Sequence, residues 1–186
     1  MKTLRTLLRA LLLVAGLSGL AACSVAPPDG VVPLTGFEAD RYLGRWYEIA
    51  RLDHRFERGM TDVHATYRRL ENGGIEVVNR GYDPARQAWK EAVGHALFIS
   101  DPGTASLKVS FFGPFYGGYH VVELDRDAYR WALVAGPSRD YLWILARERS
   151  IGDDVRDRLT ARARALGFDT AALIWVEQRQ PTEPTQ

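Results

Sequence analysis

Histidine is the side chain best suited to acid–base chemistry near neutral pH, and the sequence contains His54, His64, His95 and His120. His54 follows Asp53, an arrangement that could move a proton to or from a bound molecule. The sequence offers no nucleophile beside it, no G-x-S-x-G turn in residues 23–186, and no H-E-x-x-H spacing for a metal ion. We therefore predict no catalytic residue, metal or cofactor, and expect a binding protein rather than an enzyme.

Cys23 is the sole cysteine, and the residues before it indicate a covalent modification. Residues 1–9 carry three basic side chains and no acid, and residues 10–22 form an uncharged run of 13 residues rich in leucine and alanine. A basic start followed by a short apolar run is typical of a secretory signal peptide, and the run is shorter than the roughly 20 residues of a membrane span. Leu20-Ala21-Ala22-Cys23 resembles a bacterial lipobox, in which the cysteine is acylated and becomes the first mature residue.

This resemblance implies that Cys23 carries a lipid anchor. Because Ser24 is not acidic, it further implies sorting to the outer membrane, where we expect the periplasmic face. We predict a signal peptide over residues 1–22, the lipidated Cys23 and a flexible tether over 23–36, a folded domain over 37–180 and a polar tail over 181–186. The tether prediction rests on the three prolines and two glycines of residues 24–36.

The composition excludes some classes of function. The chain has 24 Lys and Arg against 23 Asp and Glu, so no excess of positive charge supports nucleic-acid binding. Five Trp, eight Tyr and seven Phe can fill a core or line a pocket for an apolar ligand. With 186 residues, the chain is long enough for one domain with a substantial core.

The alternation of apolar and polar residues predicts which parts of the chain form strands. Period-two runs separated by turn signals such as Asn72-Gly73-Gly74 predict eight strands, over residues 46–52, 62–68, 75–82, 89–98, 107–111, 119–124, 129–135 and 141–147. The short connections favour an antiparallel meander, and eight strands can avoid exposed edges by closing into a barrel. A helix that begins near Ser150 or Gly152 and ends at Gly167 follows, and then a short strand over 173–176. The predicted fold is all-β, an eight-stranded antiparallel up-and-down β-barrel with one C-terminal α-helix and a short final strand.

Three motifs give this pattern a resemblance to the lipocalin family. Gly44-Arg45-Trp46-Tyr47 is similar to the family's G-x-W-Y motif, residues 124–129 occupy the place of its second motif without the usual T-D-Y spelling, and Arg147 matches its third-motif arginine. The runs 46–59, 108–119 and 136–147 resemble the bacterial outer-membrane lipoprotein lipocalins, which are relatives of apolipoprotein D. The resemblance implies that Gly44, Trp46 and Arg147 form the barrel floor, with the guanidinium of Arg147 against the indole of Trp46.

Strand parity and the resemblance together predict which side chains face the lumen. With Trp46 inward, Glu48 and Ala50 should point the same way, and Glu48 needs a partner such as Arg147 or a tyrosine because an unpaired buried carboxylate is costly. The predicted ligand-binding residues are mostly apolar or aromatic: Tyr67, Val77, Asn79, Phe98, Val109, Phe111, Tyr119 and Trp143. Residues 111–118 are unusually apolar for a turn, which indicates a ligand portal, a membrane contact or a homodimer surface.

These features predict a membrane-anchored protein that stores or transports fatty acids, lysophospholipids or phospholipids in the bacterial cell envelope. Two alternatives stay open at this point. The barrel could house a lipid-modifying enzyme that uses His54 or Glu48, or it could be a structural or interaction barrel filled by its own side chains.

Overall fold

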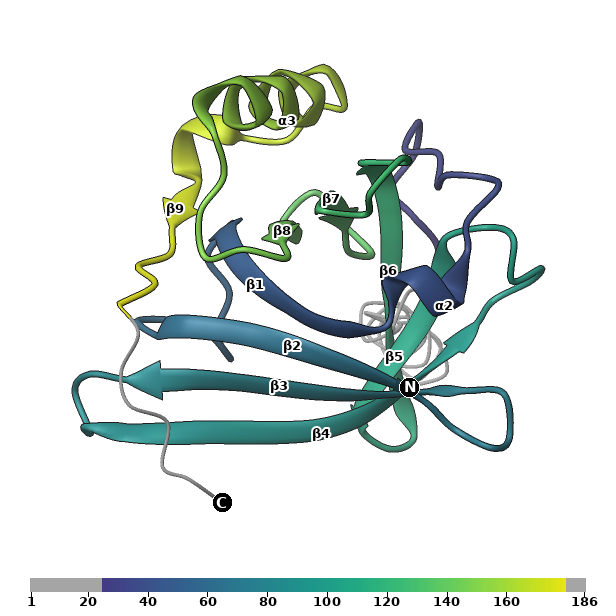
Figure 1. Ribbon diagram of the computed structural model, residues 1–186, viewed down its shortest axis with the longest axis horizontal. Helices are drawn as coiled ribbons and strands as arrows, with labels where there is room; N and C mark the ends of the chain where they lie inside the picture. Colours follow the sequence, from purple (N-terminus) through teal and green to yellow (C-terminus); the bar gives the residue numbers. More distant parts are fainter. Residues whose placement is uncertain (1–24, 180–186) are drawn as a thin grey trace, which may run out of the picture.

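The computed structural model describes residues 25–179, which fold into a closed antiparallel β-barrel (Figure 1). Cys23 and its predicted acylation, the signal peptide and the polar tail lie outside the described residues. The strands are β1 (Gly44–Arg51), β2 (Thr61–Arg69), β3 (Ile75–Asp83), β4 (Ala88–Phe98), β5 (Ser106–Phe112), β6 (Phe115–Leu124), β7 (Trp131–Ala135) and β8 (Leu142–Ala146). A short helix α2 (Ala39–Tyr42) precedes them, and α3 (Asp153–Ala165), a 3₁₀ turn (Thr170–Ala172) and β9 (Ile174–Trp175) follow.

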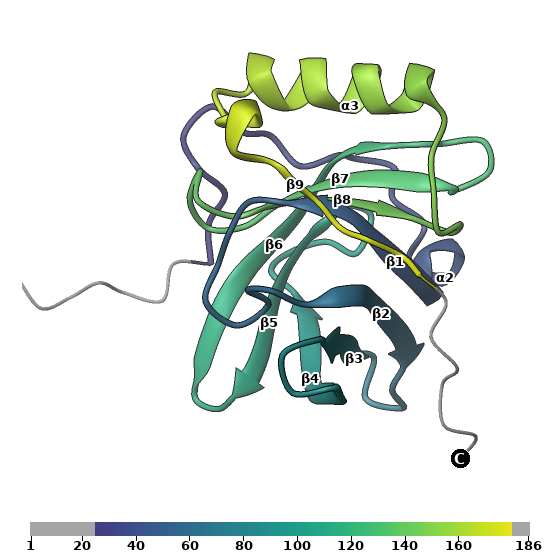
Figure 2. The same ribbon diagram turned by 90° about the vertical axis from the view of Figure 1, so that its left-hand side faces the viewer.

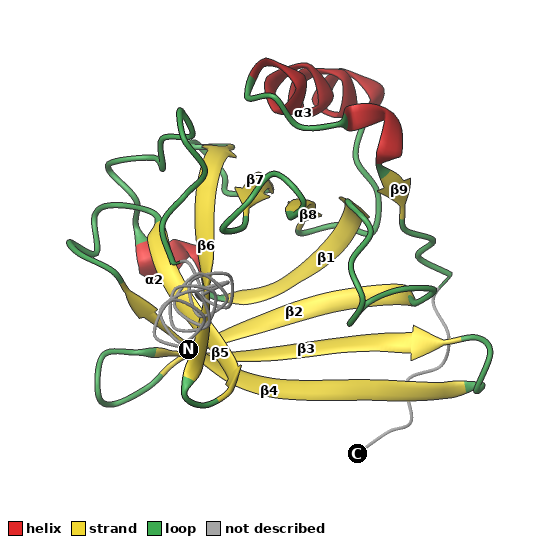
Figure 3. Cartoon of the chain, turned by 180° about the vertical axis from the view of Figure 1, so that it is seen from behind, coloured by secondary structure: helices red, strands yellow, loops and turns green. Residues whose placement is uncertain are grey.

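The barrel closes through β1. Each strand from β2 to β7 pairs with the next one along the chain, and β1 pairs with β8 on one side and with β2 on the other. The predicted meander of eight strands is confirmed, as are the helix and the final strand, β9, which pairs with the end of β1. Seen from behind in Figure 3, α2 lies at the end of the barrel where β1 begins. That end is the floor, and the loops at residues 52–60, 84–87, 113–114 and 136–141 form the opposite mouth.

Two apolar cores share the barrel wall. The inner core lies inside the barrel around the fully buried Trp46. The outer core lies between the wall and α3, where Leu133 and Ile144 meet Leu159 and Ala163 of the helix. Figure 2 shows α3 lying across the outside of the barrel above β7 and β8. The helix thus covers the outer face of β7 and β8, and these strands are buried on both sides because their inner faces point into the barrel.

The segment before the barrel differs from the expected flexible tether. Val31 is buried in the outer core, and the backbone of Leu34 bonds to both Val121 and Ala105, with N···O distances of 2.9 and 2.8 Å. The apolar side chains among the prolines and glycines explain the difference, because they gain stability by covering the wall. The ordered part of the chain therefore begins before residue 37, and residues 25–36 pack on the barrel.

His120 is buried beneath this segment. It points outward from β6, its Nδ1 lies 3.0 Å from Ser106 Oγ, and the backbone of Val25 covers the other side of the ring. Burial lowers the pKa of His120 from the usual 6.5 to about 4, against the opposing effect of the neighbouring Ala26 and Val25 backbone. The folded protein therefore keeps this imidazole neutral at a pH where the unfolded chain protonates it.

We expect acid to destabilise the protein through His120. Between pH 6.5 and about 4 the unfolded state binds one more proton at this position, so the free energy of unfolding falls as the pH falls through this window. The loss should reach roughly 2 kcal/mol after allowance for solvent near the ring. Urea unfolding of the wild type and His120→Asn from pH 4.5 to 7.5 measures it. Parallel stability curves for the two proteins would contradict this assignment.

Candidate functional site

A cavity of about 550 Å³ lies inside the barrel and opens at the mouth. Seven of the eight predicted ligand-facing residues line it: Tyr67, Val77, Asn79, Val109, Phe111, Tyr119 and Trp143. They come from five different strands, and alternation along each strand turns them toward the lumen. That these side chains contact a ligand stays a prediction, but the structure places them around one space.

Phe98 differs from this expectation, since it is not among the residues that line the cavity. It sits at the end of β4, paired with Leu107, and packs on the inner core, where its ring centroid lies 6.5 Å from that of Phe37. The side chain of Phe98 points inward as predicted, but it lies at the level of the packed floor, below the cavity. Inward parity therefore does not distinguish a residue that lines the cavity from one that fills the floor beneath it.

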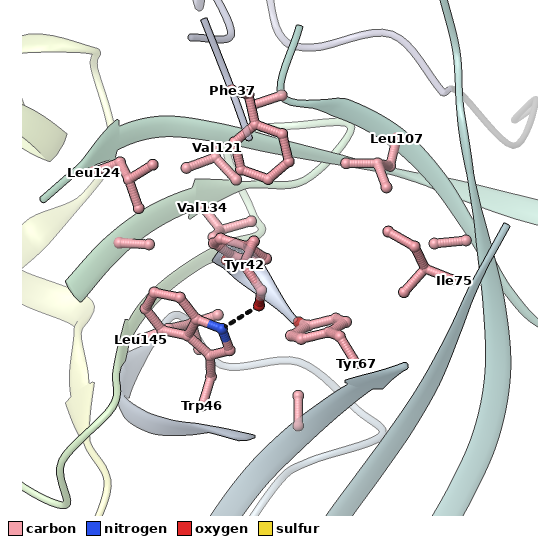
Figure 4. Close-up of a cluster of buried hydrophobic side chains, with 14 of the residues drawn as sticks. Phe37, Tyr42, Trp46, Tyr67, Ile75, Leu107, Val121, Leu124, Val134 and Leu145 are labelled. Atoms are coloured by element: carbon pink, nitrogen blue, oxygen red, sulfur yellow. Dashed lines mark hydrogen bonds between the residues drawn. The ribbon is translucent and has the colours of Figure 1, made fainter. Parts of the chain in front are cut away.

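The floor brings the predicted residues Trp46 and Arg147 together. The guanidinium carbon of Arg147 lies 4.1 Å from the indole centroid, a cation–π contact worth about 1–2 kcal/mol when partly desolvated. The indole N–H of Trp46 donates to the carbonyl oxygen of Tyr42 at 2.8 Å, a bond drawn in Figure 4, where apolar side chains surround the ring. Both contacts fix the indole across the closed end of the barrel.

Gly44 completes the floor. Arg147 donates to the carbonyl oxygens of Arg41 and Arg45 at 2.7 and 2.9 Å, so it ties α2 to the start of β1. Gly44 lies between those two residues with φ of +93°, and a Cβ there would lie 3.3 Å from Arg147 Nη1. Glycine suits this position because it adopts positive φ without strain and leaves room for the guanidinium.

A buried charged cluster lies on one wall of the cavity. Arg51 donates to Glu48 Oε1 at 2.6 Å and to the carbonyl oxygen of Glu57 at 2.7 Å. Glu57 Oε2 accepts from the indole of Trp143 at 3.2 Å and lies 2.9 Å from His54 Nε2. Burial, helped by the neighbouring Glu57 carboxylate, raises the pKa of Glu48 well above its usual value. The cluster holds the 52–60 loop on the cavity wall, and Glu48 and Glu57 both face the cavity.

The partner of Glu48 corrects the sequence prediction. Arg51 fills this role, and neither Arg147 nor a tyrosine does. The β1–β8 register shifts between Glu48 and Ala50, which is a β-bulge that breaks the alternation along β1. For the same reason Ala50 lies in the outer core and does not face the lumen as expected. Alternation alone cannot reveal such a change of parity within a strand.

The mouth carries apolar side chains in contact with solvent. The turn expected over residues 111–118 is reduced to Gly113-Pro114, because its other residues extend β5 and β6. Phe56, Phe112 and Phe115 are 58%, 80% and 63% exposed. A second cavity of about 480 Å³ shares part of this rim with the first, and its lining adds the cations Arg55, Arg80 and Lys90. The same lining contains the carboxylates of Glu57 and Glu91, so the mouth combines exposed aromatic side chains with charges of both signs.

Residues 25–179 show few of the side-chain arrangements that are typical of a catalytic site. Over residues 25–179 no group of three His, Cys, Asp or Glu side chains is placed to hold a metal ion, and no helix in this range could cross a membrane. The hydroxyl of Ser138, which lines the cavity, donates to Asp140 Oδ2 at 2.9 Å. His54 is stacked on Phe56 at 4.0 Å between ring centroids, and its Nε2 faces Glu57. These contacts are those of a side chain that supports a loop.

Comparisons with known proteins agree with this geometry. The family model described as a lipocalin-like domain matches residues 37–178 of this chain. The outer membrane lipoprotein Blc of Citrobacter freundii is 56% identical over 159 residues, which cover 86% of this chain and 89% of the relative. Apolipoprotein D of Mus musculus is 34% identical over 151 residues, which cover 76% of this chain and 77% of the relative. A crystal structure of the cockroach allergen Per a 4 superposes with a TM-score of 0.65 at 21% identity, over 82% of this chain and 96% of the other, and supports the fold.

These matches cover the whole barrel, including the floor motif and the strands that line the cavity. The family's members are binding proteins and not enzymes, which agrees with the prediction that this chain binds a ligand without transforming it. The chain therefore belongs to the lipocalin family, and within it to the bacterial lipoproteins related to apolipoprotein D.

Proposed function

We propose that this protein stores or transports fatty acids, lysophospholipids or phospholipids in the bacterial cell envelope. The observation that carries the proposal is the cavity of about 550 Å³, which is closed at the floor, open at the mouth and lined mostly by apolar and aromatic side chains. Each methylene moved from water into such a lining contributes about 0.8 kcal/mol, so an acyl chain can bind without a specific polar contact. A space of this size also argues against a barrel filled by its own side chains.

We further propose that a lipid on Cys23 holds the protein at the outer membrane, on the periplasmic face. Relatives such as that of Citrobacter freundii are named outer membrane lipoproteins. Cys23 precedes Val25 by two residues, which is at most about 7 Å of extended chain, and Val25 already packs against β6. The anchor would then keep the barrel close to the membrane. A homodimer through the exposed phenylalanines of the mouth stays a prediction.

The ligand can be identified by native mass spectrometry. The full chain carrying Cys23→Ala, which cannot be acylated there, is purified from bacterial cells, and its bound molecules are extracted and identified. We expect fatty acids or phospholipids in a complex with one barrel. If no lipid co-purifies and added hexadecanoate leaves the tryptophan fluorescence unchanged, the proposed function is wrong.

A further inference from the structure

Three tyrosine hydroxyls meet at the level of the cavity floor. The Oη atom of Tyr119 lies 2.8 Å from that of Tyr42 and 2.9 Å from that of Tyr67. Tyr67 and Tyr119 line the cavity, whereas Tyr42 lies behind them, with its ring stacked on Trp46 at 4.5 Å between centroids. Figure 4 shows Tyr42 and Tyr67 among apolar side chains. Hydroxyls in such a place are costly unless their hydrogen bonds are made.

The hydrogen bonds of these hydroxyls leave one donor unused. Each phenol has one O–H group, and the two contacts use two of the three protons. If Tyr42 donates to Tyr119 and Tyr119 donates to Tyr67, the unused proton is on Tyr67. If both donations are reversed, the unused proton is on Tyr42. When both outer phenols donate to Tyr119, the unused proton is on Tyr119. Two of these three arrangements place it on a residue that lines the cavity, and within residues 25–179 the three hydroxyls make no side-chain hydrogen bond beyond these two contacts.

The protonation state of the three phenols does not change near neutral pH. Burial raises the pKa of Tyr42, Tyr67 and Tyr119, and for Tyr119 both neighbouring phenols add to the effect. The unused proton is therefore present throughout the physiological range. The cluster offers a neutral donor at the closed end of an otherwise apolar tube.

We propose that the hydroxyls of Tyr67 and Tyr119, which line the cavity floor, bind an oxygen atom near the far end of the ligand's chain. The ligand class would then include acyl chains with a hydroxyl, keto or epoxide group near the ω end, inserted with this end first. The inference rests on the proposed function, because it requires that the cavity accept an acyl chain. A carboxylate fits the floor less well, since one neutral donor does not replace the water lost by a full negative charge, and Arg147 is bonded to the carbonyl oxygens of Arg41 and Arg45.

A matched pair of ligands isolates this contact. Isothermal titration calorimetry with the full Cys23→Ala chain compares hexadecanoate with 16-hydroxyhexadecanoate, and 2-hydroxyhexadecanoate controls for a hydroxyl at the other end. In an apolar floor the ω-hydroxyl would weaken binding, but with the phenol donor we expect the 16-hydroxy acid to bind as tightly as hexadecanoate or more tightly. In Tyr67→Phe/Tyr119→Phe its affinity relative to hexadecanoate should fall about fivefold or more, the effect of one lost hydrogen bond.

Tyr42→Phe is the control variant. It leaves Tyr67 and Tyr119 with two protons and one mutual contact, so one donor stays available and the affinity ratio of the two acids should not change. An equal ratio in the wild type and the double variant, with hexadecanoate bound by both, overturns this inference and leaves the proposed function standing. If neither acid binds the wild type, both are overturned.

A measurement on the unsubstituted tyrosines avoids any effect of the substitutions on folding. The keto stretch of 15-oxohexadecanoate bound to the Cys23→Ala chain should shift to lower wavenumber than in hexane, because a phenol donates to the carbonyl oxygen. A stretch equal to that in hexane would overturn the inference.

Discussion

Glutamate in place of Val109 is expected to weaken the binding of an acyl chain by about 100-fold or more. Val109 lies on β5 and lines the cavity, where an apolar wall surrounds it. A carboxylate in such a wall lacks the water that stabilises it, and an acyl chain placed against it would remove what water remains, at a cost of several kcal/mol. A loss of about 2.7 kcal/mol already corresponds to 100-fold in affinity. Titration calorimetry with hexadecanoate measures the loss, and hexadecanol, which is uncharged, separates it from repulsion between two carboxylates.

Val93→Glu is the matched control for this prediction. Val93 lies on β4, is 55% exposed and is not among the residues that line the cavity, so the same substitution there should leave the affinity unchanged. Both variants need circular dichroism spectra like that of the wild type for the comparison to hold. An affinity of Val109→Glu within a few-fold of the wild type would contradict the assignment of the lumen as the binding site.

Much of the barrel could be predicted from residue types alone. The alternation of Val63, Ala65 and Tyr67 with polar neighbours is visible in the sequence, and the structure places all three in the lining of the cavity. Short turns then specify antiparallel neighbours, so that both topology and lumen follow from local patterns. The floor could be predicted through the resemblance of Gly44-Arg45-Trp46-Tyr47 and Arg147 to a known family, since residues about 100 positions apart have no local signal that they meet.

The buried charged cluster could not be predicted, for two physical reasons. The bulge in β1 shifts the parity between Glu48 and Ala50, and alternation of side chains contains no sign of it. Glu57 belongs to the loop after β1, and loops lack the periodicity that assigns a strand residue to one face. The only available signal was the cost of leaving Glu48 unpaired, which required a partner without specifying which one.

The packing of residues 25–36 does not follow from their sequence, because the prolines and glycines indicate a tether while the apolar side chains among them show no periodic pattern. Val31 and Leu34 have little local preference for order, and it is the finished barrel wall that provides their contacts. The same limit applies to Phe98, whose level in the barrel depends on how far the floor is filled. Such features depend on the tertiary structure, which a local pattern does not contain.

Replacement of Trp46 by alanine is expected to lower the free energy of unfolding by about 3–5 kcal/mol, the usual cost of removing a buried tryptophan. Trp46 is fully buried, whereas Trp89 is only partly buried on the outside of the barrel, yet each ring has an arginine against it: Arg147 at 4.1 Å and Arg80 at 4.8 Å from the ring centroids. Trp89→Ala should therefore cost only about 1 kcal/mol. Urea unfolding of both variants measures the difference. Because both substitutions remove a cation–π contact, the excess for Trp46 reports the burial of the indole across the floor, and equal costs would show that the floor does not depend on it.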